Sequence, residues 1–319
     1  MEVIYGLDNW QQRFPRIITA IGNFDGVHLG HQQIIRTTIE QARARRGTAM
    51  VMTFEPHPEE LINPGNSPPL LTTGAEKARI LRKMGVDVLL LVEFNEAFRK
   101  ITPREFITVV LKDKLGLEGV VVGYDYRFGL RGEGTTALLR QLGEAISLSV
   151  TIVPPVVVKG TVVSSTRIRQ LLWKGQIRQA AELLGRYPSV EGIVVHGDKR
   201  GRNLGFPTAN IQVPRKLALA RGVYLVKCGL AKDIFYGVAN VGSAPTFNRE
   251  EVRLEINLFD YSGELYGERI RVEFLAYLRP EKQFRSLEEL RKQISTDIQR
   301  AKGMLAGSEV APSSEFPSL

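Results

Sequence analysis

The segment Gly22-Asn23-Phe24-Asp25-Gly26-Val27-His28-Leu29-Gly30-His31 decides the fold of the first half of the chain. It follows the apolar stretch 16–22 (RIITAIG), which predicts a buried strand, and it opens residues 31–45, whose apolar positions recur at helical spacing. Three glycines allow the backbone to turn tightly and to approach a ligand closely. The N-terminus of the predicted helix then offers free N–H groups and a partial positive charge to a phosphate.

Two of the four histidines of the chain, His28 and His31, lie in this segment. Their spacing of three lets both imidazoles point the same way at the helix start. Two imidazole donors there suit the α-phosphate of ATP under attack, because its oxygens gain charge in the transition state. The alternative is a capped helix start with incidental histidines. The order of strand, glycines and HxGH favours the nucleotide site.

Strand-like and helix-like stretches alternate through the first half of the chain. Apolar strands separated by helices predict a parallel sheet that is covered on both faces, and such sheets bind ligands beyond the carboxyl ends of their strands. Further strands are expected at 48–54, 86–92, 119–123 and 149–158, and further helices at 75–84, 104–115, 136–142 and 166–184.

The pattern changes near residues 185–188, after which strands dominate. Strand character at 190–196, 222–228, 234–241, 252–259 and 269–275, separated by Gly/Pro/Asn-rich turns, predicts a small antiparallel barrel. A helix from Ser286 to about Met304 follows, with Ser286 as the expected N-cap. We therefore expect an α/β chain with three parts: a Rossmann-like nucleotidyltransferase domain over 1–184, a β-barrel domain over 185–305, and a disordered tail over 306–319.

The charge of the chain suits phosphorylated substrates. Its 43 Lys and Arg against 34 acidic residues give a formal charge of +9, yet no basic run resembles a nucleic-acid arm. No stretch approaches the roughly 20 apolar residues of a membrane helix, so neither nucleic acid nor membrane is an expected partner. The single cysteine, Cys228, lies in an alternating apolar stretch and predicts a buried, inert thiol. With an N-terminus unlike a signal peptide, these features predict a cytoplasmic protein; they do not define an oligomeric state.

Two other segments of the first half support a nucleotide site. Residues 164–169 (SSTRIR) place hydroxyls and arginines at an expected helix start, where they could hold phosphates or serve as a plain cap with solvated arginines. Residues 123–129 (GYDYRFG) follow the predicted strand 119–123, although their aromatic side chains could be core. A G-x-G-x-x-A match at 132–137 lacks the acidic residue that a dinucleotide site needs, and the chain contains no P-loop.

A second cluster, residues 197–210 (GDKRGRNLGFPTAN), lies in the strand-rich half. Its Gly-rich basic part suits a loop that wraps a phosphate. Thr208 and Asn210 are two residues apart and face one side of an extended chain, and their oxygens suit Mg²⁺ carried by ATP. An ordinary polar turn is the competing interpretation.

The first-half motifs resemble those of the FMN adenylyltransferase module of prokaryotic bifunctional riboflavin kinase/FAD synthetases, within the HxGH nucleotidyltransferase superfamily. The resemblance implies adenylyl transfer to FMN with release of pyrophosphate, and it needs no general base because the FMN phosphate is already an anion. It implies catalytic roles for His28 and His31 and a flavin side that includes Asp125 and Phe128. It also implies ATP and phosphate contacts from Gly22, Asn23, Phe24, Gly26, Gly30, Ser165, Thr166 and Arg169.

The second cluster resembles the riboflavin kinase signature with PTAN at its centre, and residues 237–247, 254–267 and 274–284 match later segments of that family. The resemblance implies that Glu255 accepts the proton of the ribityl hydroxyl, that Thr208 and Asn210 hold the metal, and that Arg279 lies on the flavin side. It implies phosphate contacts from Gly197, Lys199, Gly201 and Gly205. Where the family has His and Arg, this chain has Asn257 and Ala244, and we expect neither departure to abolish activity.

Taken together, the matching segments span residues 21 to 297 in the family's order. The resemblance implies a transferase that phosphorylates riboflavin to FMN and adenylylates FMN to FAD. ATP, riboflavin and FMN are then its ligands, Mg²⁺ accompanies ATP, and FMN and FAD are substrate and product rather than prosthetic groups. The alternatives are a chain with one degraded module, or a flavin- or RNA-binding regulator that borrowed the fold. Glu255 and both HxGH histidines argue against them, since binding alone does not require these residues.

Overall fold

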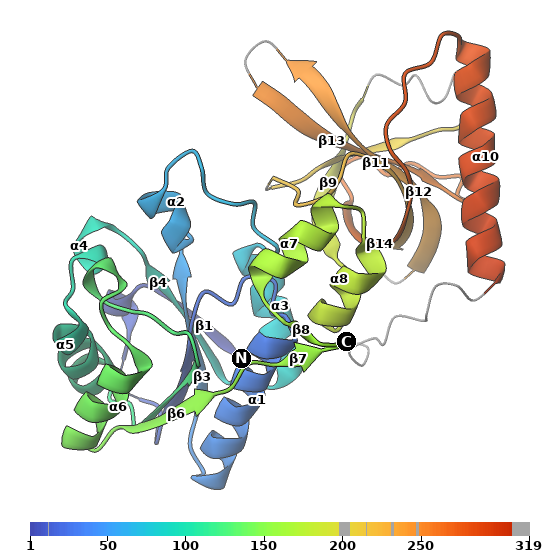
Figure 1. Cartoon of the computed structure of the whole chain (residues 1–319). Coiled ribbons are helices and arrows are strands. Elements are labelled where there is room, and N and C mark those ends of the chain that lie inside the picture. The colour runs from blue at the N-terminus through green and yellow to red at the C-terminus, as the bar shows by residue number, and fades with distance from the viewer. Residues whose placement is uncertain (12, 198–204, 215, 231–232, 247–248, 308–319) are drawn as a thin grey trace. The chain divides into compact units, whose positions relative to one another are not determined.

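The computed structural model describes residues 1–11, 13–197, 205–214, 216–230, 233–246 and 249–307 (Figure 1). Its contacts group the chain into two compact units, each described here by itself. The first unit comprises residues 1–68 and 74–164, and the second comprises residues 69–73 and the chain from Ser165 onward.

A six-stranded parallel sheet organises the first unit, in the order β1-β4-β3-β2-β5-β6. Its first strand was not expected: the N-terminal residues pair with β4 and form one edge of the sheet. The strands predicted at 16–22, 48–54, 86–92 and 119–123 are confirmed with small shifts at their ends. The strand predicted over 149–158 ends at Val153, and residues 157–158 pair with residues 161–162 in a separate two-stranded sheet. The bounds are β1 Glu2–Tyr5, β2 Ile18–Ile21, β3 Ala49–Glu55, β4 Val88–Glu93, β5 Gly119–Gly123 and β6 Ser149–Val153.

Helices cover both faces of this sheet, as its apolar strands predicted. Alternation along β2 places Ile18 and Ala20 on the face covered by α1 (Leu29–Ala44) and α3 (Gly74–Met84). It places Ile21 on the face covered by the π-helical segment η2 (Phe106–Lys114) and α6 (Thr136–Ala145) (Figure 1). The short elements are η1 Leu7–Asn9, α2 Pro58–Ile62, α4 Glu96–Arg99, α5 Pro103–Glu105, η3 Leu130–Gly132, β7 Val157–Val158 and β8 Thr161–Val162.

The strand order reverses at β2, which pairs with β3 on one side and with β5 on the other. Ile18 lies opposite Gly119 and Ala20 opposite Val121, so the two strands run parallel and in step. The loops that follow β2 and β5 therefore leave the sheet side by side. A reversal point of this kind is where open α/β sheets bind ligands.

A closed barrel forms the second unit, in the order β10-β13-β12-β11-β14-β9, with every neighbouring pair antiparallel. Two helices precede it, α7 (Ser165–Trp173) and α8 (Ile177–Leu184). Within the described residues, no helix is long and apolar enough to cross a membrane. The barrel strands are β9 Ser189–Val195, β10 Ala209–Gln212, β11 Gly222–Leu230, β12 Asp233–Thr246, β13 Arg249–Leu258 and β14 Arg269–Arg279.

The C-terminal helix α10 (Leu287–Ala306) begins where the sequence predicted, with the Ser286 hydroxyl accepting the Glu289 N–H at 3.1 Å. Its Ala301 is fully buried in an apolar cluster with barrel side chains such as Val223 and Leu275. The predicted tail falls almost wholly on residues 308–319, which lie outside the described residues.

A mostly buried ion pair also ties α10 to the barrel. The Arg279 Nε donates to both carboxylate oxygens of Asp297 at 3.0 Å, and its Nη2 donates to Oδ2 at 2.8 Å. Gln293 donates to the same carboxylate at 3.0 Å. The Asp297 side chain is 7% exposed and that of Arg279 is 18% exposed, so both charges are largely removed from solvent.

We expect Asp297→Ala to lower the free energy of unfolding of the barrel by about 3 kcal/mol, because it leaves the Arg279 charge buried without its partner. The matched control is Lys302→Ala on the same helix, where Lys302 pairs with Asp260 in solvent. That substitution should cost less than about 1 kcal/mol. Urea unfolding followed by circular dichroism measures both. Equal losses in the two variants would contradict the role of the buried pair.

Candidate active sites

The HxGH segment forms the turn from β2 into α1. Gly22 still donates its N–H to the Met52 carbonyl of the neighbouring strand, at 3.2 Å. His28 is the N-cap of α1, and its Nδ1 accepts the backbone N–H of His31 at 3.2 Å. An acceptor nitrogen carries no proton, so neutral His28 bears its proton on Nε2. The cap bond therefore fixes which nitrogen of His28 can donate to a ligand.

The two histidines lie together, as their spacing predicted. Their rings stack with centroids 3.5 Å apart, and the edge of Phe24 packs against His31 at 5.3 Å. Gly30 makes this packing possible, because a Cβ there would lie 3.1 Å from His28 Cε1. The HxGH glycine thus makes room for the imidazole of the cap.

The loop after β5 carries the predicted flavin-side residues Asp125 and Phe128. Asp125 is exposed beside the exposed Tyr124, at the edge where the β2 and β5 loops emerge. Phe128 points the other way: it is 6% exposed and packs between Tyr126 and Phe106 in the core. Its core contacts hold the loop, whose exposed side chains are Tyr124, Asp125 and Arg127.

The SSTRIR segment starts α7 at Ser165, as expected, and belongs to the second unit. Thr166 is exposed on the first turn. Arg169 is buried, and its Nε donates to the Pro69 carbonyl at 2.9 Å, so part of its donor set anchors residues 69–73.

In the barrel, the register assembles a polar row that the sequence did not reveal in full. Glu255 of β13 lies directly opposite Asn210 of β10 on one side and opposite Asn240 of β12 on the other. Directly opposite residues share a face, with Cβ atoms about 4.5–5.5 Å apart. The predicted base and a predicted metal ligand are therefore neighbours. Asn240 was missed, because only the pairing of β12 with β13 shows which residue faces Glu255.

Asn257, at the position where the family has His, donates a hydrogen bond to the segment that contains Thr208. Its Nδ2 donates to the Pro207 carbonyl at 2.8 Å, and the side chain is 9% exposed. It lies two residues after Glu255, on the same face of β13. The bond ties β13 to the residue immediately before Thr208 and so holds the PTAN segment in place.

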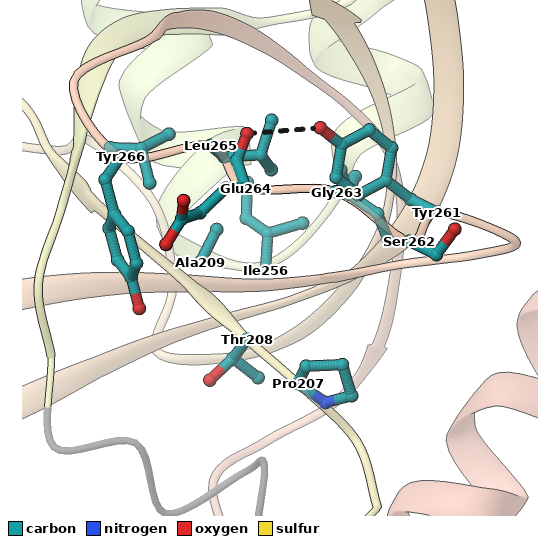
Figure 2. Close-up of a pocket in the computed structure, with 12 residues that line it drawn as sticks. Pro207, Thr208, Ala209, Ile256, Tyr261, Ser262, Gly263, Glu264, Leu265 and Tyr266 are labelled. Carbon is teal, nitrogen blue, oxygen red and sulfur yellow. Dashed lines mark hydrogen bonds between the residues drawn. The ribbon is translucent and has the colours of Figure 1, made fainter.

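A pocket of about 520 Å³ opens beside this segment. Thr208 lies at its edge, and the 261–266 loop closes it from above, with Tyr261 and Tyr266 at its two ends (Figure 2). Tyr266 also packs on His196, with ring centroids 3.8 Å apart. The walls are largely apolar, which suits a flat ligand: Val194, Ala209, Ile256, Leu258 and Leu265.

The predicted phosphate contacts of this segment are three glycines and one lysine, and the structure describes two of the glycines. Lys199 and Gly201 lie outside the described residues. Gly197 packs against the Asn210 side chain so closely that a Cβ would collide with its amide group, and Gly205 is exposed in a turn. Gly197 therefore fixes the path of the chain that leads into this loop.

The barrel residues fit a magnesium ion that arrives with a nucleotide. The hydroxyl of Thr208, the amide oxygen of Asn210 and the carboxylate of Glu255 are hard oxygen donors on adjoining strands. No group of three His, Cys, Asp or Glu in the described part of the chain could hold a metal alone. This donor set suits Mg²⁺, which keeps several waters and binds through few protein ligands plus substrate phosphates.

Comparisons with known proteins agree with the order of the two domains. The FAD synthetase family model matches residues 11–167, and the riboflavin kinase model matches residues 184–305. Bifunctional riboflavin kinase/FMN adenylyltransferases from Escherichia coli K12 and Bacillus subtilis 168 are 39% and 37% identical to the chain. These alignments cover 93% and 89% of this chain and 96% and 91% of the relatives.

A solved structure described as a macrolide-efflux protein from Streptococcus pneumoniae has the same two-domain fold. It is 32% identical with a TM-score of 0.84, and the match covers 95% of this chain and 99% of that one.

The chain belongs to the family of bifunctional riboflavin kinase/FMN adenylyltransferases. It is a transferase whose FAD synthetase domain precedes its riboflavin kinase domain, and the two domains serve the conversion of riboflavin to FMN and of FMN to FAD.

We expect Asn257→Asp to slow riboflavin phosphorylation by about tenfold, because a carboxylate cannot donate to the Pro207 carbonyl and the PTAN segment loses its tether. Steady-state assays with riboflavin and ATP measure the effect. Adenylylation of supplied FMN by the same protein is the internal control and should not change. Normal riboflavin phosphorylation in this variant would show that the tether has no part in the reaction.

Proposed function

We propose that the chain uses ATP twice, through two separate sets of residues. The barrel transfers the γ-phosphoryl group of ATP to riboflavin, and the parallel-sheet domain transfers AMP to the resulting FMN. The observation that carries the proposal is that each domain brings predicted catalytic groups together by itself: the stacked His28–His31 pair at the start of α1, and Glu255 directly opposite Asn210 in the barrel.

In the barrel, Glu255 accepts the proton of the terminal ribityl hydroxyl. That oxygen forms a bond to the γ-phosphorus, the bond from phosphorus to the β–γ bridging oxygen breaks, and ADP leaves. A carboxylate suits this role because the hydroxyl must lose its proton as it attacks. Thr208 and Asn210 hold the Mg²⁺ that accompanies ATP, and the ion offsets charge on the phosphates.

The pocket beside Thr208 accommodates the base of ATP in this proposal. Its apolar walls and Tyr266 suit a flat ring, while its polar edge at Thr208 leads along β10 to Asn210. Ala209 and Ile256, which line the pocket, face the opposite side of the strands from Asn210 and Glu255. The triphosphate would therefore pass Thr208, just before β10, to reach the side of the sheet on which Glu255 lies.

In the parallel-sheet domain, a phosphate oxygen of FMN attacks the α-phosphorus of ATP and pyrophosphate leaves. The phosphate is already an anion, so no base is required. His28 donates from Nε2, because its Nδ1 is engaged in the cap, and His31 adds a second donor. Such donors lower the barrier when they are aimed at oxygens that gain charge. Asn23 and the N-terminus of α1 hold the phosphates, and Asp125 is assigned to the flavin side. The family resemblance assigns Ser165, Thr166 and Arg169 to the phosphate end of adenylylation, and Arg279 to the flavin side of the kinase reaction.

The cysteine fits a protein of a reducing compartment, and we place the enzyme in the cytoplasm. Cys228 is fully buried, and burial raises the pKa of its thiol to about 12. A thiol in that state is neither a nucleophile nor a metal ligand.

Glu255→Gln should slow FMN formation by roughly 10²–10⁴ because the amide keeps the shape but cannot accept the proton. Affinity for ATP should be nearly unchanged. Glu268→Gln, an exposed carboxylate of the same domain, is the matched control and should keep full activity. Single-turnover assays with riboflavin resolve the step. A near-normal rate for Glu255→Gln would remove Glu255 from the role of base.

His31→Ala should slow FAD formation from supplied FMN by roughly 10²–10³, the usual loss for one donor aimed at a transition-state oxygen. The substitution keeps the backbone N–H that bonds to His28, so the helix cap survives. FMN should accumulate from riboflavin, as chromatography of the flavins would show. Gln33→Ala, exposed on the same turn of α1, should behave as the parent chain. Loss of both activities in a folded His31→Ala protein would contradict independent sites.

A further inference from the structure

The loop between β2 and α1 is held in a strained backbone conformation. Phe24, Gly26 and Val27 have φ angles of 47°, 84° and 39°, which lie in the left-handed region. For Val27, a β-branched residue, this region is sterically unfavourable, and it costs Phe24 free energy as well. Both side chains are nearly fully buried. Such a conformation persists only where the surroundings impose it.

Two buried polar side chains hold the strained segment, one at each end. At its start, the Lys77 ammonium of α3 donates to the Asn23 carbonyl at 2.7 Å and to Thr53 Oγ1 at 3.1 Å. The Thr53 hydroxyl in turn donates to the same carbonyl at 3.1 Å. At its end, Gln32 Nε2 donates to the Val27 carbonyl at 3.0 Å.

Lys77 is the unusual member of this set, because a buried ammonium is costly where a neutral donor could make similar bonds. The side chain is 6% exposed, and burial lowers its pKa to about 8. Asp25, in the loop after β2, and Glu55, at the end of β3, are the charged groups that act against this lowering. Two carboxylates therefore attract the positive charge, and the ammonium contacts the backbone of the loop that would receive a triphosphate.

We propose that Lys77 is a positioning residue for FMN adenylylation. This inference rests on the proposed function of the parallel-sheet domain. The ammonium fixes the carbonyl of Asn23, whose own side chain is exposed, and thereby sets the direction in which that side chain and the start of α1 meet the nucleotide. Its charge also offsets Asp25 and Glu55. Without the charge, these carboxylates repel the phosphates of ATP.

The first test compares Lys77→Met with Arg82→Met, an exposed position on the same helix. Lys77→Met should lower kcat/KM for adenylylation of supplied FMN by about 10- to 100-fold, the range for loss of a hydrogen bond from a charged donor. Arg82→Met should not change it, and riboflavin phosphorylation should stay normal in both. A folded Lys77→Met protein with unchanged kcat/KM overturns the proposal.

A pH profile separates the charge of Lys77 from a packing role. kcat/KM reports the free enzyme, so it should fall as pH rises above about 8 in the parent chain. In Lys77→Arg the fall should move upward by at least about one pH unit, because a guanidinium keeps its proton. An unmoved fall overturns the role of the charge.

The titration of Lys77 does not itself destabilise the fold over this pH range. Between pH 8 and the ordinary lysine pKa, the unfolded chain binds more protons at Lys77 than the folded chain does, so this group raises stability as pH rises. Thermal unfolding over the same pH range checks the sign.

If Lys77→Met fails to fold, the pH profile of Lys77→Arg tests the proposal by itself, and an unmoved fall of kcat/KM overturns it. If the parent chain makes FMN but no FAD at any pH, the proposed function of the domain fails. If the parent chain forms FAD and Lys77→Met has the same kcat/KM for adenylylation, only the role of Lys77 is contradicted.

Discussion

The first domain depends on one hydrogen bond, from the backbone N–H of His31 to Nδ1 of His28. It satisfies a donor that the start of a helix leaves open. The same bond orients the imidazole of His28 and leaves its proton on Nε2. One contact therefore both caps the helix and determines which nitrogen can donate to a ligand. The stacked partner ring follows from the same geometry, since both side chains leave the first turn of α1 on one side. The reversal of strand order at β2 then determines that this turn opens beside the loop after β5.

In the barrel, strand register and not a helix terminus brings the polar side chains together. Glu255 gains its neighbours because β13 lies between β10 and β12, and no one of the three strands carries the full set of groups. Side chains on one face of antiparallel neighbours meet in rows. Asn257 uses the next position on the same face to hold Pro207. The departure from the family's His is thus compatible with an ordered PTAN segment.

Much of this organisation could be predicted from local sequence. Glycines, histidine spacing and apolar runs indicated the strand–turn–helix unit, the parallel sheet and the barrel, because each feature is encoded within a few residues. Edge strand β1 was missed because a four-residue stretch becomes a strand only through its pairing with β4. The donor role of Asn257 and the engagement of Arg279 by Asp297 were also missed, since their partners are 50 and 18 positions away in the sequence.

The sequence by itself determined the two domains, their order, their family and the segments that carry the chemistry, because these are properties of local patterns and of the ligands they suit. Only the tertiary structure decided which nitrogen of His28 can donate, which residues stand beside Glu255, and that Lys77 lies buried under the Asn23 carbonyl. The first is a bond between residues three apart, whose geometry the sequence allowed but did not fix. The other two depend on the approach of elements distant in the chain, and such contacts follow from packing and register, which no local pattern of residues specifies.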